Sequence, residues 1–409
     1  MRQTTYSLAL PVYIPTFLLS VGTGVLIPTL PLYAKSYGVS NTLIALAVAA
    51  AGLGTLLGDV PAGTLLERYG RKPVMVFGTI ALAIVTLLAA TIHNFPILIL
   101  LRLISGVASA MWNISRMAYL TDVVPLRDRG RALSMFGGVN RIGTFAAPAL
   151  GGVIAQHYGL ASPFYVSAVA AAAAAVISIF WVTESRHAGS TGPRHMRWQI
   201  VGDLVRHHWR ELGTAGSAQI FAQMIRNGRQ LIVPLYAHDV LGLSEEQIGG
   251  VISISSAIDM SLFLPAGFLM DKLGRKYASV PSFIVMAIGM AMIPFATNYF
   301  GLLAATCVMG FGNGIGSGTM MTLGADLAPR EATGEFLGVW RLIGDVGQTG
   351  GPLVVGGIAD LVGLTMAALS LSGVGILAAA TLLLFVRETL AQGPSVGPLP
   401  APAAPARSG

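Results

Sequence analysis

The chain has 409 residues, of which 54% are hydrophobic and only 11% are charged. Soluble globular domains carry about 25% charged residues on average, so most of the exterior of this protein is expected to face lipid. The net charge of +7 does not indicate nucleic-acid binding, because the basic residues are distributed along the chain in the way that membrane topology requires.

Apolar stretches that are long enough to cross the hydrocarbon core recur along the whole sequence, at about 20 residues each. Clear examples are residues 8–32, 73–92, 161–182 and 277–296. Strands of a membrane barrel would alternate polar and apolar residues, and these stretches do not. About twelve such spans account for the chain length, so the sequence predicts an all-α polytopic membrane protein with twelve transmembrane helices.

The basic residues predict which side of the membrane each loop occupies. If both termini and the loops after even-numbered helices share one side, every basic loop residue except Lys35 lies there. Positive loop residues are retained on the cytoplasmic side during insertion. We therefore expect a multi-pass protein of the cell membrane with both termini in the cytoplasm.

A shift of 204 residues aligns the two halves of the sequence without gaps over most of their length. Parallel six-helix repeats are a transporter architecture in which the site lies between the halves. We expect a six-helix bundle at residues 1–183, a linker at 184–212, a second six-helix bundle at 213–387 and a disordered cytoplasmic tail at 388–409. The aligned pairs include Gly70 with Gly274, Arg71 with Arg275, Asp122 with Asp326, Pro148 with Pro352, and Glu184 with Glu388.

Two loop segments carry a family resemblance. Residues 63–72 (GTLLERYGRK) and 267–276 (GFLMDKLGRK) resemble the loop signature of the major facilitator superfamily and its second copy. The first copy has Glu67 where the family usually has Asp. Residues 143–152 (GTFAAPALGG) and 102–106 (RLISG) are similar to signatures of its drug:proton antiporter branch. The resemblance implies a twelve-helix secondary transporter of a small molecule. We expect it to act as a monomer and without a cofactor.

Glycines, cations and carboxylates recur together in the loop signature. The resemblance implies that they form gating clusters, which hold helices against the opposite half in one conformational state. The alternative is that the cations only anchor the topology, but that does not explain why carboxylates recur with them. The gating set comprises Gly63, Glu67, Gly70, Arg71 and Asp122 in the first half, and Gly267, Asp271, Gly274, Arg275 and Asp326 in the second.

Ionisable residues also occur inside the predicted spans. Each costs at least about 2.5–3.5 kcal/mol at a helix centre, so none should face lipid. They fall on the second, fourth, fifth, seventh, eighth and eleventh helices, which predicts that every third helix lies on the outside. These residues are Arg102, Arg116, Arg141, Arg226, Arg229, Arg341, Asp59, Asp259 and Asp345.

Polar side chains form stripes at helical spacing on the fourth and seventh helices, with a weaker stripe on the tenth. A stripe through a membrane helix must face water or polar partners on a neighbouring helix, and hydrogen bonding between helices is the alternative to a cavity. One central aqueous cavity explains both main stripes. Its predicted lining is Arg102, Asn113, Arg116, Arg141, Gln219, Gln223, Arg226, Asn313 and Arg341.

Asp259 and Asp345 are the candidates for proton coupling. No cation lies within a turn of Asp259 on its own helix, so it either finds an arginine elsewhere or is partly protonated, because desolvation raises the pKa of a carboxyl group. Asp345 lies four residues after Arg341, which allows a local ion pair, while Arg141 is its repeat equivalent and could meet it across the pseudo-twofold axis. Asp59 is expected to be solvated near the end of its helix.

The pattern favours a proton-coupled exporter of small organic molecules that works by alternating access. The excess of buried cations over acids favours anionic or amphiphilic substrates. Uptake or flipping of an anionic metabolite or lipid is the alternative, and a membrane sensor or intramembrane enzyme is a remote one. No nucleotide-binding Gly-x-x-x-x-Gly-Lys-Ser/Thr loop is found, and neither a metal site nor nucleic-acid binding is expected.

Overall fold

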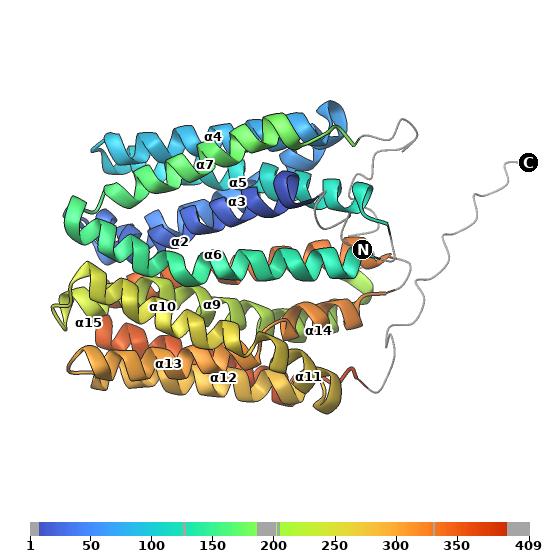
Figure 1. The fold of residues 1–409 in the computed structure, drawn as a ribbon. Coiled ribbons are helices and arrows are strands. Elements are labelled where there is room, and N and C mark those ends of the chain that lie inside the picture. Colours follow the sequence, from blue (N-terminus) through green and yellow to red (C-terminus); the bar gives the residue numbers. More distant parts are fainter. Residues whose placement is uncertain (1–7, 126–127, 186–201, 203–204, 330–331, 391–409) are drawn as a thin grey trace, which may run out of the picture.

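The computed structural model describes residues 8–125, 128–185, 202, 205–329 and 332–390, and within these residues all regular structure is helical. The helices run nearly parallel or antiparallel to one another, with the first half stacked on the second (Figure 1). The first half contains η1 (Ala9–Tyr13), α2 (Ile14–Lys35), α3 (Asn41–Tyr69), α4 (Arg71–Thr91), α5 (Phe95–Val123), α6 (Arg129–Tyr158) and α7 (Ser162–Trp181). The second half contains α9 (Trp209–Asp239), α10 (Glu245–Ser261), α11 (Phe263–Leu273), α12 (Arg275–Met292), η3 (Ile293–Phe295), α13 (Tyr299–Ile315), α14 (Thr319–Leu327) and α15 (Thr333–Phe385).

The predicted twelve spans are confirmed. Eight helices of the described chain are long and apolar enough to cross a membrane, and α10 with α11 forms one further span that is bent by 43°. The long α15 contains two spans, because the backbone turns at Gly363, where φ is +87°. The remaining spans, α6 and α9, have 30 and 31 residues, and their polar side chains lower their mean hydropathy.

The two ends of the bundle differ in charge. We call the end that contains the turns at Gly70 and Gly274 the basic end, because Arg71 and Arg275 follow these turns directly. The opposite end, which contains Lys35 and the turn at Gly363, is called the far end. Both Gly70 and Gly274 have positive φ angles, of +96° and +111°, a backbone region that favours glycine.

Some sequence-based boundaries fall on residues that the structure does not describe. The expected linker lies largely outside the described residues, at 186–201 and 203–204, and so do residues 391–409 of the expected tail. The helix α9 begins at Trp209, inside the expected linker, because the amide of Leu212 already donates to the carbonyl of His208. The basic residues Arg2, Arg127, Arg186, Arg194, Arg197, Arg330 and Arg407 also lie outside the described part.

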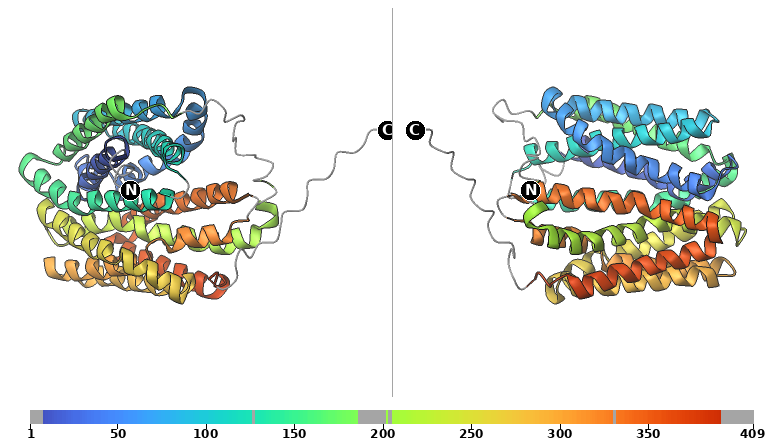
Figure 2. Two further views of the ribbon diagram at one scale, coloured as in Figure 1. Left: turned by 45° about the vertical axis from the view of Figure 1, so that its right-hand side comes forward. Right: turned by 180° about the vertical axis from the view of Figure 1, so that it is seen from behind.

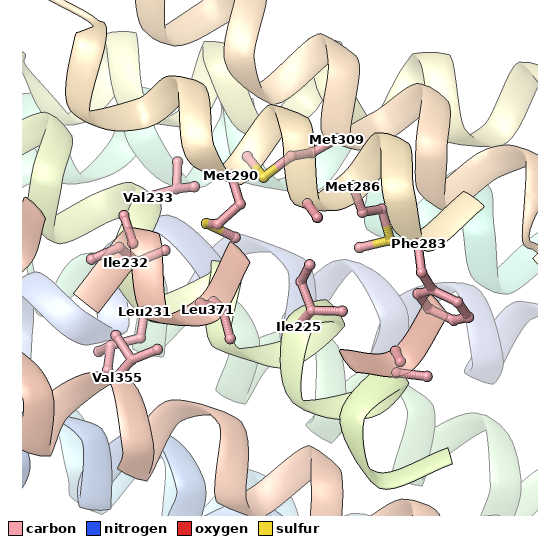
Figure 3. Packing of buried hydrophobic residues seen from close by; sticks show 14 of the residues in the cluster. Ile225, Leu231, Ile232, Val233, Phe283, Met286, Met290, Met309, Val355 and Leu371 are labelled. Atoms are coloured by element: carbon pink, nitrogen blue, oxygen red, sulfur yellow. The ribbon is translucent and has the colours of Figure 1, made fainter. Parts of the chain in front are cut away.

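The core of the second half is built around α9. This helix packs against α15, and α12 packs against both α13 and α15. Figure 3 shows Ile225 of α9, Met286 of α12 and Leu371 of α15 pointing toward one another. All three side chains are at most 1% exposed, so burial of apolar surface fixes α9 in the middle of its half.

Two helix pairs join the halves: α6 packs against α10, and α3 packs against α15. The helices α3 and α15 lie side by side in the view from behind (Figure 2). At the far end these pairs approach to backbone contact. A Cβ atom on Gly152 would lie closer than 3.0 Å to the carbonyl oxygen of Glu245, and one on Gly356 would do the same with Asn41. The two contacts are equivalent under the 204-residue shift, so the far end is closed by a symmetric pair of glycine contacts.

Toward the basic end, long side chains span the interface instead of close backbone contact. Arg341 of α15 reaches Asp59 of α3, and Arg141 of α6 reaches Asp259 of α10. The far end is also held by an ion pair between Lys35 and Asp239, which are themselves repeat equivalents. The two ends of the interface are therefore built from different kinds of contact.

We expect Gly356→Ala to lower the apparent Tm of the purified protein, because the new methyl group must push α15 away from α3. Overpacking of this kind costs about 1–3 kcal/mol. The matched control is Gly357→Ala, where a Cβ would meet nothing within 4 Å. Alanine should be neutral or stabilising there, because glycine is the poorer helix former. Equal melting temperatures for both variants would show that the far-end contact is not tight.

Candidate functional site

A cavity of about 150 Å³ lies beside α2, lined mainly by the first half. Leu26 and Leu30 of α2 form part of its apolar wall. Its polar lining on α5 comes from Arg102, Ser105 and Ser109, which share one face at helical spacing. This part of the predicted α5 stripe therefore faces a cavity.

A smaller cavity of about 60 Å³ is lined mainly by the second half. Arg229 of α9 and Ser255 and Ser256 of α10 supply polar groups to its wall. Ile27 of α2 and Gln230 of α9 line both cavities, so the two spaces meet where α2 and α9 approach each other across the interface. Together they form the candidate site.

The candidate site carries positive charge. Arg102 lines the larger cavity and Arg229 the smaller one, and no acidic residue lines either. Among the described residues neither arginine forms an ion pair, and the buried Nε of Arg102 has no hydrogen-bond partner. A buried cation without a partner favours an anionic ligand, because the alternative is an uncompensated charge.

The α9 stripe does not follow the cavity along its length. Gln219 and Gln223 pack against Gly344 and Gly347 of α15, and Arg226 donates to the carbonyl of Gly316, 3.0 Å away. None of the three predicted α9 residues lines either cavity, because α15 covers the two glutamines and the end of α13 covers Arg226. Arg229 and Gln230 of α9 line the site instead.

The end of the α5 stripe nearest the basic end also faces protein. The guanidinium of Arg116 lies 4.0 Å from the ring centroid of Phe136 in α6, and the residue is only 7% exposed. Asn113 is partly buried and lines neither cavity. Stacking on an aromatic ring compensates a buried guanidinium without a carboxylate.

Asp259 finds its cation on the other half of the molecule. Its Oδ1 lies 3.6 Å from Nη1 of Arg141, and its Oδ2 accepts a hydrogen bond of 2.7 Å from Nδ2 of Asn313. Arg141 also donates to the hydroxyl of Ser317. The first of the two alternatives for Asp259 is therefore what the structure shows. Arg141 and Asn313, both expected in the cavity, serve this inter-half contact.

Arg341 pairs with two carboxylates. Its Nη2 lies 3.4 Å from Oδ2 of Asp59, and its Nε lies 3.9 Å from Oδ2 of Asp345. The expectation that Asp59 is solvated is wrong, because its side chain is only 15% exposed and crosses to the other half. Arg141 does not pair with Asp345, since the two lie at different inter-half contacts, α6–α10 and α3–α15.

The predicted gating clusters repeat almost atom for atom. Nε of Arg71 lies 2.8 Å from Oδ2 of Asp122, and Nε of Arg275 lies 2.9 Å from Oδ2 of Asp326. In this conformation both pairs connect helices of the same half. Asp271 lies 3.5 Å from Arg275 but is 70% exposed, and in the described chain Glu67 makes no ion pair with Arg71.

A glutamate that follows each half completes its cluster, and sequence reasoning did not include it in the gating set. The carboxylate of Glu184 accepts hydrogen bonds from the amides of Arg71 and Lys72. Glu388 does the same with Arg275 and Lys276. Burial raises the pKa of Glu388, but the backbone donors, including Leu390, lower it overall, so the carboxylate stays ionised at the exposed start of α12. The repeat pairing of Glu184 with Glu388 was the available signal.

Comparisons with known proteins agree with this architecture. The family model of the Major Facilitator Superfamily matches residues 12–258 and 215–408. An uncharacterized MFS-type transporter of Methanocaldococcus jannaschii is 24% identical over 86% of this chain and 91% of its own length. The quinolone resistance protein NorA of Staphylococcus aureus is 24% identical over 85% and 89%.

A solved structure shares the fold. The D-xylose-proton symporter superposes with a TM-score of 0.78 and 18% identity, over 94% of this chain and 98% of its own. The twelve-helix arrangement and the match of the family model to nearly the whole chain lead to one assignment. This chain belongs to the Major Facilitator Superfamily and is a multi-pass membrane transporter of small molecules, not an enzyme.

Proposed function

We propose that this transporter exports small organic anions by alternating access and that protons moving in the opposite direction drive it. The observation that carries the proposal is that Arg102 and Arg229 form no ion pair with a described residue and line adjoining cavities whose described lining contains no acid. The apolar wall contributed by α2 suits a substrate that also has a hydrophobic part.

The direction of transport rests on two supports. The similarity to NorA, a quinolone resistance protein, favours export. The basic loop residues favour a cytoplasmic location for the basic end and both termini. With that orientation the symmetric glycine contacts close the external end of the interface, and a substrate would enter this conformation from the cytoplasm.

Proton coupling requires a carboxyl group that alternates between the two sides of the membrane. Asp259 and Asp345 are the candidates, and each lies at a contact between the halves. An acid at such a contact changes its surroundings when the halves move, which changes its proton affinity. The same residues would then couple proton binding to opening and closing.

The proposal is tested in two stages. Purified full-length protein is first screened by thermal shift against organic anions, organic cations and lipids, since a ligand that binds the folded state raises the apparent Tm. Ligands that stabilise are then loaded into proteoliposomes of known orientation under an imposed pH gradient. Anion movement toward the acidic compartment supports the proposal. A response to cations alone, or movement that ignores the gradient, contradicts it.

We expect Arg102→Gln to abolish most of the ligand-induced rise in Tm, because it removes the charge that the anion compensates. A buried charge pair broken on one side costs about 3–5 kcal/mol, which corresponds to at least a hundredfold loss of affinity. The matched control is Arg116→Gln, which removes an arginine stacked on Phe136 outside both cavities. A rise that persists in Arg102→Gln would remove this residue from the site.

We expect Asp326→Asn and Asp271→Asn to slow turnover at least about tenfold, which corresponds to a barrier about 1.4 kcal/mol higher. Only Asp326→Asn should also lower the apparent Tm, because Asp326 binds Arg275 at 2.9 Å whereas Asp271 is mostly exposed. The exposed carboxylate acts in another conformation, as the family resemblance implies. Normal turnover in both variants would show that these residues only fix the membrane topology and do not take part in gating.

A further inference from the structure

The α3–α15 contact holds two carboxylates and one cation. Arg341 reaches Asp59 in the first half at 3.4 Å and Asp345 on its own helix at 3.9 Å. Both distances exceed the about 2.7–2.9 Å of a strong charge-assisted hydrogen bond. The guanidinium therefore lies between two carboxylates and forms a strong charge-assisted hydrogen bond with neither.

Each carboxylate retains an oxygen without a donor. Oδ1 of Asp59 and Oδ2 of Asp345 are buried and accept no hydrogen bond from any described residue. With both acids ionised, the three side chains carry a net charge of about −1, which a poorly solvated site does not tolerate well. Two carboxylates in such a site favour the uptake of one proton, which turns one oxygen into a donor.

Within the described part of the chain, Arg341 is the one cation that forms an ion pair with Asp59 or Asp345. Asp345 interacts electrostatically with Arg341 and Asp59, and Asp59 interacts with Arg341. Arg116 of α5 acts on Arg341 but is stacked on the ring of Phe136, and α9 presents the uncharged Gln219 to this part of α15. One proton would neutralise the charge that remains on these three side chains.

The other inter-half contact is balanced without a proton. Arg141 faces the single carboxylate of Asp259, whose Oδ2 accepts a hydrogen bond from Asn313. Oδ1 of Asp259 is also buried without a hydrogen bond, so the two contacts differ in their ratio of cations to acids and not in their unpaired oxygens. Arg226 and Arg229 lie within electrostatic range of Asp259 as well. Because this site already has at least one cation for each acid, it provides an internal control for the α3–α15 cluster.

We propose that Asp59 and Asp345 bind one proton between them and that this proton determines how firmly Arg341 holds the two halves together. When Asp345 is protonated, Asp59 is the remaining anionic partner of Arg341, and the contact from α15 to α3 is strengthened. When both acids are ionised, Asp345 competes for Arg341 from its own helix, and the contact weakens. The titration belongs to the pair and not to either residue alone.

The cluster is accessible from outside the protein beside Arg341. Its side chain is 51% exposed, whereas those of Asp59 and Asp345 are 15% and 19% exposed. The proton is therefore exchanged with solvent beside Arg341. This exchange involves no oxidation or reduction. The proposal rests on proton coupling as proposed above, names Asp59 as a proton-binding residue, and favours this pair over Asp259 as the carrier.

The test uses the full chain in lipid nanodiscs with the Cys307→Ser substitution, and it needs no substrate. Difference infrared spectra between pH steps report the carbonyl stretch of a protonated carboxylic acid. Wild-type protein should show one component of this band that titrates with a single midpoint, distinct from the components of the exposed acids. Asp59→Asn or Asp345→Asn should remove it or move its midpoint by at least about 1 pH unit. The control, Asp259→Asn, should keep both the band and the midpoint.

Spin labels at Tyr69→Cys and Leu273→Cys, both exposed positions at the basic end, report the distance between the halves. Asp345→Asn mimics the protonated acid and should hold the shorter low-pH distance at every pH. Asp59→Asn removes the partner in the first half and should hold the longer distance at every pH. Arg341→Lys keeps the positive charge and should retain a pH response. This variant replaces either of the other two if that variant fails to fold.

The outcomes separate the two proposals. If Asp59→Asn and Asp345→Asn keep the wild-type band and distances, or if Asp259→Asn loses them, the shared proton site is wrong. If the titration behaves as expected but no pH gradient drives transport in proteoliposomes, the proton site stands and the proposed exporter function fails. Gradient-driven transport with an unchanged titration overturns only the proton site.

Discussion

A charge inside a membrane span persists only where another charge, a hydrogen-bonding group or water compensates it. The nine ionisable residues discussed above obey this constraint in different ways. Arg141 meets Asp259 across the halves, Arg226 donates to a backbone carbonyl, and Arg116 stacks on an aromatic ring. Arg102 and Arg229 form no ion pair in the described chain, although Arg229 lies within electrostatic range of Asp259, and both line a cavity. The same constraint that holds the helices together therefore marks the place where a ligand is expected.

Symmetry governs the periphery of this transporter more than its interior. The gating pairs, the glutamates that cap them and the glycine contacts at the far end all recur at a shift of 204 residues. Inside, the repeat equivalent of Arg141 is Asp345, and that of Asp59 is Phe263, whose ring lies 4.4 Å from the guanidinium of Arg141. Equivalent helix pairs thus carry different charges, which allows one contact to be balanced and the other to lack a cation.

The sequence was sufficient to predict features that depend on local pattern. Span lengths and the repeat follow from hydropathy and spacing, and the charge clusters that contain Arg71 with Asp122 and Arg275 with Asp326 follow from the family resemblance. The partner of a buried charge does not, because a stripe identifies the face of a helix but not the neighbour that covers it. Gln219 and Gln223 meet the glycines of α15, and Asp59 meets Arg341 more than 280 residues away in sequence. Such contacts depend on how the two halves dock, which no local period encodes.

The two ends of the interface should open in different ways. At the far end, Gly152 and Gly356 allow the backbones of neighbouring helices to come into contact. Such close-packed surfaces separate all at once, because a small displacement already loses much of the dispersion attraction. Toward the basic end, Arg341 and Arg141 are long side chains that can exchange partners one at a time. A change in charge at Asp59 or Asp345 therefore acts on the adaptable end first. The rigid end separates when the whole half rotates, which is how a local protonation event can be converted into a change of access.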